Sequence, residues 1–94
     1  MQVDVRLLPG GGSYTAEVGG ERVGRLDLSR HDGAIAYTHT EVDPRFEGRG
    51  VGGALVRVAL DDARSEGAKV VPLCSFVSAW IRKHPEYADL VKDT

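Results

Sequence analysis

Four glycines fall within the segment R-F-E-G-R-G-V-G-G, which runs from Arg45 to Gly53. Glycine in a helix interior costs about 1 kcal/mol relative to alanine, so this clustering indicates that bare backbone is needed here. A helical sequence pattern follows directly. The unpaired N–H groups of a first helical turn and the positive end of the helix dipole together bind anions such as phosphate. The segment therefore predicts a phosphate-binding turn at a helix start, built on Gly48, Gly50, Gly52 and Gly53.

Two common phosphate-binding motifs do not account for this turn. A Walker loop requires lysine and a hydroxyl residue after its last glycine, whereas this chain continues with alanine and leucine. A dinucleotide-binding motif has the spacing of Gly48, Gly50 and Gly53, but it needs an acidic residue after the second strand. The corresponding strand here ends in Cys74, and 94 residues are too few for a doubly wound domain.

Other reactive side chains lie near the ends of two strand-like segments. His39 and Glu41 fall in the segment 34–42, and Cys74 follows the short apolar segment 69–73. A histidine has an unperturbed pKa of about 6.5, which suits a general base at neutral pH. A free thiol, with a pKa of about 8.5, is already partly thiolate and can act as a nucleophile. These residues are therefore candidates for proton transfer and covalent catalysis.

The elements that position these residues follow from hydrophobic periodicity and from chain-breaking residues. Apolar–polar alternation predicts four strands joined by glycine-containing turns, and their order predicts an antiparallel meander. Strand, helix and strand then make a right-handed crossover, so the last strand should lie parallel to the fourth. The expected strands are 3–7, 14–18, 22–28, 34–42 and 69–73, and the expected helices are 51–66 and 75–83, with one more turn from Pro85.

This order makes the chain a single α+β domain over residues 1–94, with a mixed sheet of about five strands and two to three helices. The carboxyl ends of the two parallel strands should lie side by side. Strand alternation places Tyr37, His39 and Glu41 on one face of their strand. We therefore expect His39, Glu41 and Cys74 to surround one reacting group.

The turn and its flanks resemble one family. The pattern R/Q-x-x-G-x-G/A is met by R-F-E-G-R-G between a strand and a helix, as in the GNAT superfamily of acetyltransferases. The segments H-T-E-V-D-P before it, and V-P-L-C-S-F-V and H-P-E-Y after it, are similar to short, single-domain GNAT-like proteins of the YidJ type. This resemblance covers roughly residues 33 to 91 and implies a GNAT fold and transfer of an acetyl group to an amine.

The resemblance also implies where acetyl coenzyme A (acetyl-CoA) binds. In GNAT folds the glycine turn holds the pyrophosphate, and the pantetheine arm enters the gap between the two parallel strands like an added strand. Arg45 and Arg49 are both expected to flank the phosphates, and for Arg49 a phosphate contact is favoured over an ordinary surface position. The residues expected to bind coenzyme A are Val42, Arg45, Gly48, Arg49, Gly50, Val51, Gly52 and Gly53.

Two catalytic routes are open. In direct transfer, His39 or Glu41 takes a proton from the amine. A lysine-like amine, with a pKa of about 10.4, is only about 0.04% neutral at pH 7. Deprotonating it therefore costs about 4.6 kcal/mol, which a base must offset. In the other route Cys74 accepts the acetyl group first, and the resemblance implies this role, since a cysteine at this strand end is the family's proposed catalytic residue. Many GNAT enzymes use a tyrosine on the last helix as general acid, and here Ile81 occupies that position.

The missing tyrosine also supports a rival interpretation, a non-catalytic coenzyme A-binding sensor or interaction module. The N-terminal region lacks the pair of helices that usually covers the acceptor site in the superfamily, since residues 10–20 have room only for a turn and a strand. We therefore expect a shallow, open acceptor groove, which suits a protein or peptide end, or a second subunit, better than a small metabolite.

Composition narrows the partners and the compartment. The net charge of −2 comes from interspersed acids and bases, so neither nucleic acid nor a membrane is an expected partner. Residues 1–5 lack the features of a signal peptide, and there is a single cysteine, so we expect a cytoplasmic protein. The three histidines lie on separate predicted elements, which argues against a metal site. A monomer or weak dimer is expected.

Overall fold

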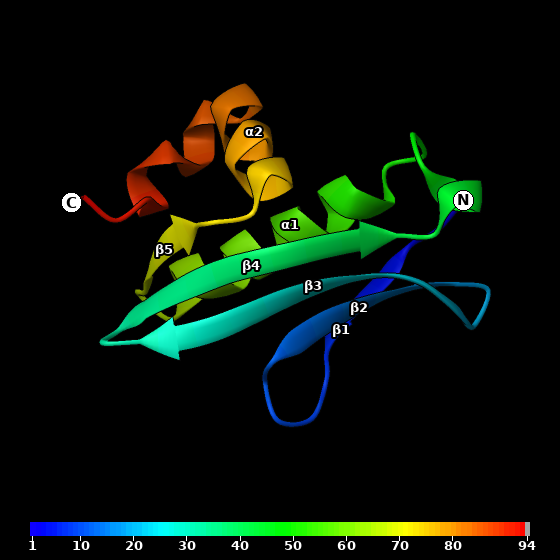
Figure 1. The fold of residues 1–94 in the computed structure, drawn as a ribbon, viewed down its shortest axis with the longest axis horizontal. Coiled ribbons are helices and arrows are strands. Elements are labelled where there is room, and N and C mark those ends of the chain that lie inside the picture. The colour runs from blue at the N-terminus through cyan, green and yellow to red at the C-terminus, as the bar shows by residue number, and fades with distance from the viewer. Residues whose placement is uncertain (94) are drawn as a thin grey trace.

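The computed structural model describes residues 1–93 and contains a five-stranded sheet in the order β1-β2-β3-β4-β5 (Figure 1). The strands are Asp4–Leu7 (β1), Ser13–Val18 (β2), Glu21–His31 (β3), Ala34–Val42 (β4) and Lys69–Pro72 (β5). The helices are Val51–Ser65 (α1) and Ser75–Lys83 (α2), with 3₁₀ turns at Pro44–Phe46 (η1) and Pro85–Leu90 (η2). Strands β1 to β4 pair antiparallel and β5 pairs parallel to β4, so the expected α+β architecture is confirmed.

Glycines set the turns at which this topology reverses. β2 and β3 are joined by Gly19 and Gly20, whose φ angles of 57° and 83° are the left-handed values that a two-residue type I′ turn requires. After α1, Gly67 has a φ of 71°, the usual left-handed termination of a helix, and the chain then enters β5. The turns therefore place β3 at the centre of the sheet and return the chain from α1 alongside β4.

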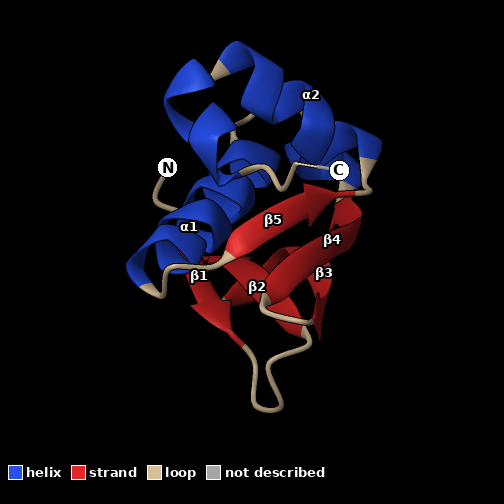
Figure 2. Cartoon of the chain, turned by 90° about the vertical axis from the view of Figure 1, so that its left-hand side faces the viewer, coloured by secondary structure: helices blue, strands red, loops and turns tan. Residues whose placement is uncertain are grey.

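The hydrophobic core lies between one face of the sheet and α1 (Figure 2). Leu55 and Leu60 of α1 are fully buried in one cluster with Leu26 of β3 and Tyr37 of β4. Burying a large apolar side chain contributes about 1.5–3 kcal/mol, so this layer supplies much of the folding free energy. Within residues 1–93 no helix covers the opposite face of the sheet, which is turned toward the viewer in Figure 1.

α2 packs closely beside the first turn of α1. A Cβ atom at Gly52 would lie 2.6 Å from the ring of Phe76, and one at Gly53 would lie 3.2 Å from Nε1 of Trp80. Trp80 is itself held by stacking on His84, with 3.7 Å between the ring centroids. The absence of side chains at these two glycines is therefore what lets the two helices approach each other.

An irregularity in β4 changes which of its side chains share a face. The consecutive β3 residues Asp27 and Leu28 pair with His39 and Tyr37, so Thr38 is an extra residue, a β-bulge. Tyr37 points into the core and donates a hydrogen bond to a carbonyl of α1, whereas His39 is exposed on the other face. The expected common face of Tyr37 and His39 is therefore wrong, because the bulge reverses the alternation between them.

Candidate active site

β4 and β5 separate beyond Tyr37. Their last paired residues are Tyr37 and Pro72, and the Cys74 N–H donates one further hydrogen bond, of 2.9 Å, to the Tyr37 carbonyl. β4 then continues to Val42, whereas the chain after Cys74 turns into α2. In the described part of the chain no strand pairs with this side of residues 38–42. The strand edge there offers its backbone N–H and C=O groups to a ligand.

A groove of about 420 Å³ links the end of β4 to the start of α1. Phe76 of α2 forms part of its wall, with 43% of the residue still exposed. Of the residues expected to bind coenzyme A, all except the two arginines line this groove. The lining residues are Thr40, Val42, Phe46, Glu47, Gly48, Gly50, Val51, Gly52, Gly53 and Phe76.

The glycines of the groove serve two purposes. Gly48 and Gly50 have left-handed φ angles of 76° and 87°, and a Cβ atom on either would project into open space. Gly52 and Gly53 also line the groove, but their missing side chains additionally make room for α2. The Ala54 N–H is the donor that closes the first turn of α1, to the Gly50 carbonyl at 3.0 Å. The three preceding amides therefore have no intrahelical acceptor and are suited to an anion.

The two arginines beside the groove have different surroundings. The Arg45 guanidinium is held by Asp43 at 2.8 Å and by Glu21 at 2.7 Å. The side chain and the N–H of Arg45 both donate to Asp43 and lower the pKa of that carboxyl. Both guanidinium groups lie over the ring of Phe46, at 5.6 Å for Arg45 and 5.7 Å for Arg49, but no carboxylate within residues 1–93 is at ion-pair distance from Arg49. These contacts favour Arg49 over Arg45 as a phosphate ligand.

Cys74 lies at the gap, and its thiol contacts Thr40 across it. The Sγ atom is 3.3 Å from Oγ1 of Thr40. Burial acts to raise the pKa of the thiol, but the Thr40 hydroxyl and the backbone amides of Val77 and Phe76 favour the thiolate, and the pKa of Cys74 lies below its ordinary value. Cys74 also immediately precedes α2, whose dipole acts in the same direction.

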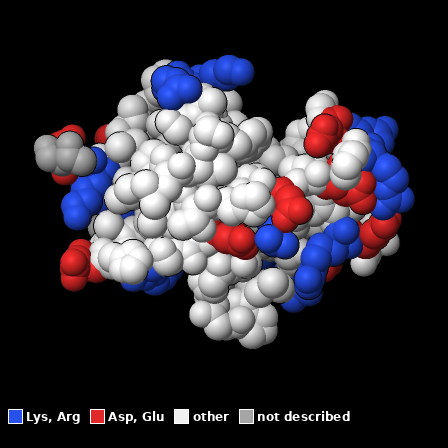
Figure 3. Space-filling view, in the orientation of Figure 1, with Lys and Arg blue, Asp and Glu red and all other residues white. Residues whose placement is uncertain are grey.

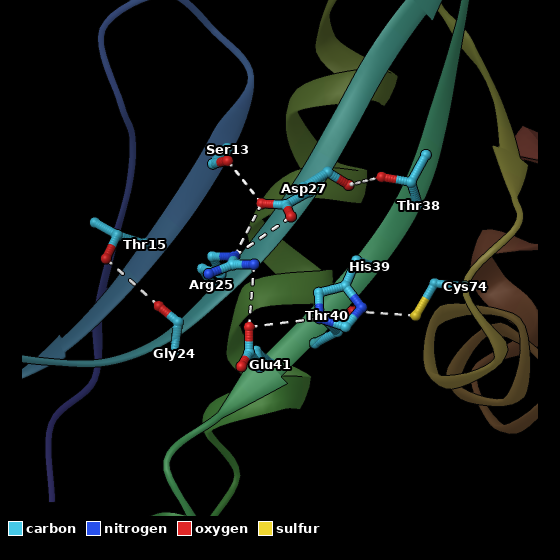
Figure 4. A network of polar contacts seen from close by, with 10 residues as sticks. All are labelled: Ser13, Thr15, Gly24, Arg25, Asp27, Thr38, His39, Thr40, Glu41 and Cys74. Carbon is cyan, nitrogen blue, oxygen red and sulfur yellow. Dashed lines mark hydrogen bonds and ion pairs between the residues drawn. The ribbon is translucent and has the colours of Figure 1, made fainter.

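His39 and Glu41 lie on the open face of the sheet (Figure 4). Nε2 of His39 is 3.4 Å from Oε2 of Glu41, and Nη2 of Arg25 is 3.1 Å from the same oxygen. Arg25 also pairs with Asp27, whose carboxylate accepts a hydrogen bond from Ser13 at 2.7 Å. Because the side chains of His39 and Glu41 are both more than half exposed, these ion pairs contribute little to stability. The network is suited to binding and proton transfer at the surface.

The structure brings only part of the set His39, Glu41 and Cys74 into direct contact. His39 and Glu41 are in contact, but the side chain that meets Cys74 is Thr40, which pairs with the core residue Leu26 on the helix side of β4. Nothing in the sequence marked Thr40, because its position depends on the bulge before it. A gap between two strands opens to both faces of a sheet, so a group held there would have the thiol on one side and the imidazole on the other.

The charge distribution of the open face is mixed. Figure 3 shows acidic and basic side chains gathered together at the end of the molecule where the N-terminus lies, with a smaller mixed group nearer the centre and broad uncharged areas between. Residues 1–93 hold no cluster of three or more histidine, cysteine, aspartate or glutamate side chains that could bind a metal ion. Within the same range, no helix combines the length and apolar character needed to cross a membrane.

Comparison of the sequence with protein families gives a match to the family described as GCN5-related N-acetyl-transferase over residues 13–90. The chain belongs to the GCN5-related N-acetyltransferase family. This match confirms the GNAT family that the glycine turn and its flanks predict. It covers the sheet from β2 onward together with the groove, Thr40 and Cys74, so the site described above lies within the family's own domain.

Solved structures have the same fold. A GCN5-like protein from Staphylococcus aureus, with 22% identity, superposes with a TM-score of 0.74 over 97% of this chain and 89% of that one. The ribosomal-protein-S18-alanine N-acetyltransferase from Escherichia coli has 14% identity and a TM-score of 0.64, over 78% of this chain and 50% of that one. A GNAT acetyltransferase from Brucella melitensis, in complex with acetyl-CoA, has 25% identity and a TM-score of 0.59, over 77% and 50%. Comparison with the curated proteins gives no match.

Proposed function

We propose that this protein transfers an acetyl group from acetyl-CoA to an amine, with the donor along the groove and the amine on the open face of the sheet. The observation that carries the proposal is the course of the groove, which joins the glycine turn to Thr40 and thereby to Cys74. Membership of the N-acetyltransferase family supports the reaction, and the related Brucella melitensis structure with acetyl-CoA supports the donor.

The residues along the groove fit the chemistry of acetyl-CoA. Its pyrophosphate is anionic, and the amides at the start of α1, with Arg49 nearby, supply N–H donors and a positive charge. Its pantetheine arm contains amide groups, which match the unpaired strand edge of residues 38–42 as an added strand would. Gly48 and Gly50 leave open the space into which a side chain would project. When bound, the cofactor supplies the activated acetyl group.

His39 is the residue placed to remove a proton from the amine. Its ring is exposed on the open face, and Nε2 lies 3.4 Å from the carboxylate of Glu41, which can orient the imidazole. Because no helix within residues 1–93 covers this face, a substrate with a large body has access to it. This access favours an amine on a protein or peptide over a small metabolite.

Binding of coenzyme A tests the donor site. Gly50→Val projects a side chain into the groove, so its affinity for coenzyme A, measured by calorimetry, should fall by about 100-fold or more, or about 2.7 kcal/mol. Gly20→Val is a matched control, because Gly20 has a similar φ of 83° and open space around its Cβ position, but lies in the β2–β3 turn. Both substitutions carry a similar backbone strain of about 1–2 kcal/mol. Equal affinities in the two variants would contradict the assignment.

The two arginines provide a second test of the same site. Loss of a charge-assisted hydrogen bond costs about 1.5 kcal/mol, so Arg49→Ala should weaken coenzyme A binding by about tenfold. Arg45→Ala should change the affinity less, because the Arg45 side chain is engaged with Asp43 and Glu21. The reverse order of effects would assign the phosphate contact to Arg45.

A further inference from the structure

Acetyl transfer leaves a sulfur atom that needs a proton. The C–S bond of the thioester breaks, and its electron pair remains on the sulfur of coenzyme A. A phenol is the donor in many related enzymes, but the tyrosine hydroxyls of this chain are engaged elsewhere. Each donates a hydrogen bond within the fold: Tyr14 to Asp62 at 2.7 Å, Tyr37 to the Ala59 carbonyl at 3.2 Å and Tyr87 to Asp61 at 2.6 Å.

Cys74 occupies the place where a donor is needed. Its N–H is fixed to the Tyr37 carbonyl at 2.9 Å, the last backbone contact before β4 and β5 separate. Its Sγ contacts Thr40 at 3.3 Å, and Thr40 lines the groove. Both contacts are made to β4 at the gap. The backbone of Cys74 binds the strand before the bulge at Thr38, and its side chain contacts the strand after the bulge.

The surroundings of Cys74 lack the general base that activates many nucleophilic cysteines. A cysteine nucleophile is activated by such a base within hydrogen-bond reach or by a lowered pKa. Within residues 1–93, the side chain in contact with Sγ is the Thr40 hydroxyl, which is not a base at neutral pH. His39 pairs with Asp27 on the open face of the sheet, whereas Thr40 and Cys74 lie on the helix side.

We propose that Cys74 donates a proton to the departing sulfur of coenzyme A in a direct transfer, with Thr40 positioning its thiol. The inference rests on the proposed function and assigns the two proton transfers to opposite faces of the gap. The amine nitrogen bonds to the acetyl carbon as the C–S bond breaks, and the amine proton passes to His39. The Cys74 Sγ–H proton passes to the coenzyme A sulfur, and solvent then reprotonates Cys74 and deprotonates His39.

The polar contacts of the Cys74 sulfur suit this role. The thiol of coenzyme A is an ordinary alkyl thiol, with a pKa of about 8.5. The pKa of Cys74 is lowered, since Thr40 and the amides of Val77 and Phe76 outweigh the effect of burial. A lowered pKa makes the Cys74 thiol a stronger proton donor than it would be without these polar contacts.

The pH dependence of turnover separates a proton donor from a nucleophile. Hydroxylamine in excess serves as the acceptor, because it stays neutral over the alkaline range, and its uncatalysed reaction with acetyl-CoA is subtracted. A donor must be protonated, so kcat should fall as the pH rises through the pKa of Cys74. Cys74→Ala should lower kcat by about 100-fold and remove this alkaline decline. A rate that rises with pH through the same midpoint would overturn the inference.

Thr40→Val tests the positioning role, and it has a readout that needs no acceptor. The variant should move both the alkaline decline of kcat and the midpoint of Cys74 alkylation by iodoacetamide to higher pH. Thr38→Val is the matched control, because the Thr38 hydroxyl donates to the Asp27 carbonyl at 3.4 Å and should leave both midpoints unchanged. Equal midpoints in the two variants would overturn the role of Thr40.

Intact mass spectrometry completes the test. Incubation with acetyl-CoA and no acceptor should leave the mass of the protein unchanged. An acetyl adduct on Cys74 that hydroxylamine removes would overturn the inference and show that Cys74 is a nucleophile. Full activity of Cys74→Ala would overturn the role of Cys74 but leave the proposed acetyltransferase function standing. Failure of the unaltered protein to bind coenzyme A in calorimetry would overturn the proposed function itself.

Discussion

The two halves of β4 differ in almost every property except chain continuity. Residues 34–37 pair with β3 on one edge and β5 on the other, and all four are buried. Residues 38–42 pair only with β3, and none of them is fully buried. The first half holds the sheet together, whereas the second half carries Thr40, His39 and Glu41. The strand becomes available for chemistry where its second partner ends, and the bulge at Thr38 marks that boundary.

The largest effect expected from this comparison is on activity, in the second half. His39→Ala should lower kcat/KM for acetyl transfer by about 10²- to 10⁴-fold, the usual contribution of a positioned general base. Its free energy of unfolding should change by less than about 0.5 kcal/mol, because the side chain is exposed. His31→Ala, at the exposed end of β3, is the control and should retain full activity. Similar activities in the two variants would show that His39 is not the base.

The first half should respond in the opposite way. Ile35 is only 3% exposed, so Ile35→Ala should lower the free energy of unfolding, measured in urea, by about 2–5 kcal/mol. Thr38→Ala, three residues along the strand, should cost less than about 0.5 kcal/mol, because Thr38 is exposed. Per folded molecule, Ile35→Ala should retain its activity at low temperature. If the folded fraction of Ile35→Ala were inactive, stability and chemistry would not be separable along β4.

A smaller effect is expected at the junction between the halves. Thr40→Val removes a hydrogen bond that favours the Cys74 thiolate and so raises the pKa of Cys74 toward its ordinary value. At neutral pH the thiolate fraction then falls, and alkylation by iodoacetamide should slow by about three- to tenfold, corresponding to about 1 kcal/mol. An unchanged rate would mean that the backbone amides at the start of α2 alone lower the pKa.

Local sequence determined the fold and much of the site. Alternation and turn glycines specified the strands, and the spacing of glycines specified the turn before α1, because each of these signals acts within a few residues. The β-bulge carries no such signal, since Thr38 is as compatible with a regular strand as with an extra residue. That one residue reverses the faces of His39 and Thr40. The sequence therefore predicted that His39 and Glu41 lie near the end of β4, but not that Thr40 is the residue that contacts Cys74.

Other features depend on contacts between distant segments. Gly52 and Gly53 fit a ligand-binding motif, and only the approach of Phe76 and Trp80 reveals that they are also required for helix packing. Arg45 fits the same motif, and the folded structure shows that its guanidinium is already paired, with nearby Asp43 and with Glu21 at the start of β3. A sequence motif assigns each residue a single role, in binding the ligand. In the folded chain Gly52 and Gly53 also make room for α2, and Arg45 also forms ion pairs.

The position of Trp80 provides an internal optical probe of the donor site. It is the only tryptophan of the chain, so the fluorescence of the protein excited at long wavelength reports on this one indole. The residue is 9% exposed and its Nε1 lies beside Gly53, at the start of α1 where the groove ends. A ligand that shifts the first turn of α1 by a fraction of an ångström alters the polarity around the indole. Its emission can therefore follow occupancy of the groove in real time, without a label and in every variant that keeps Trp80.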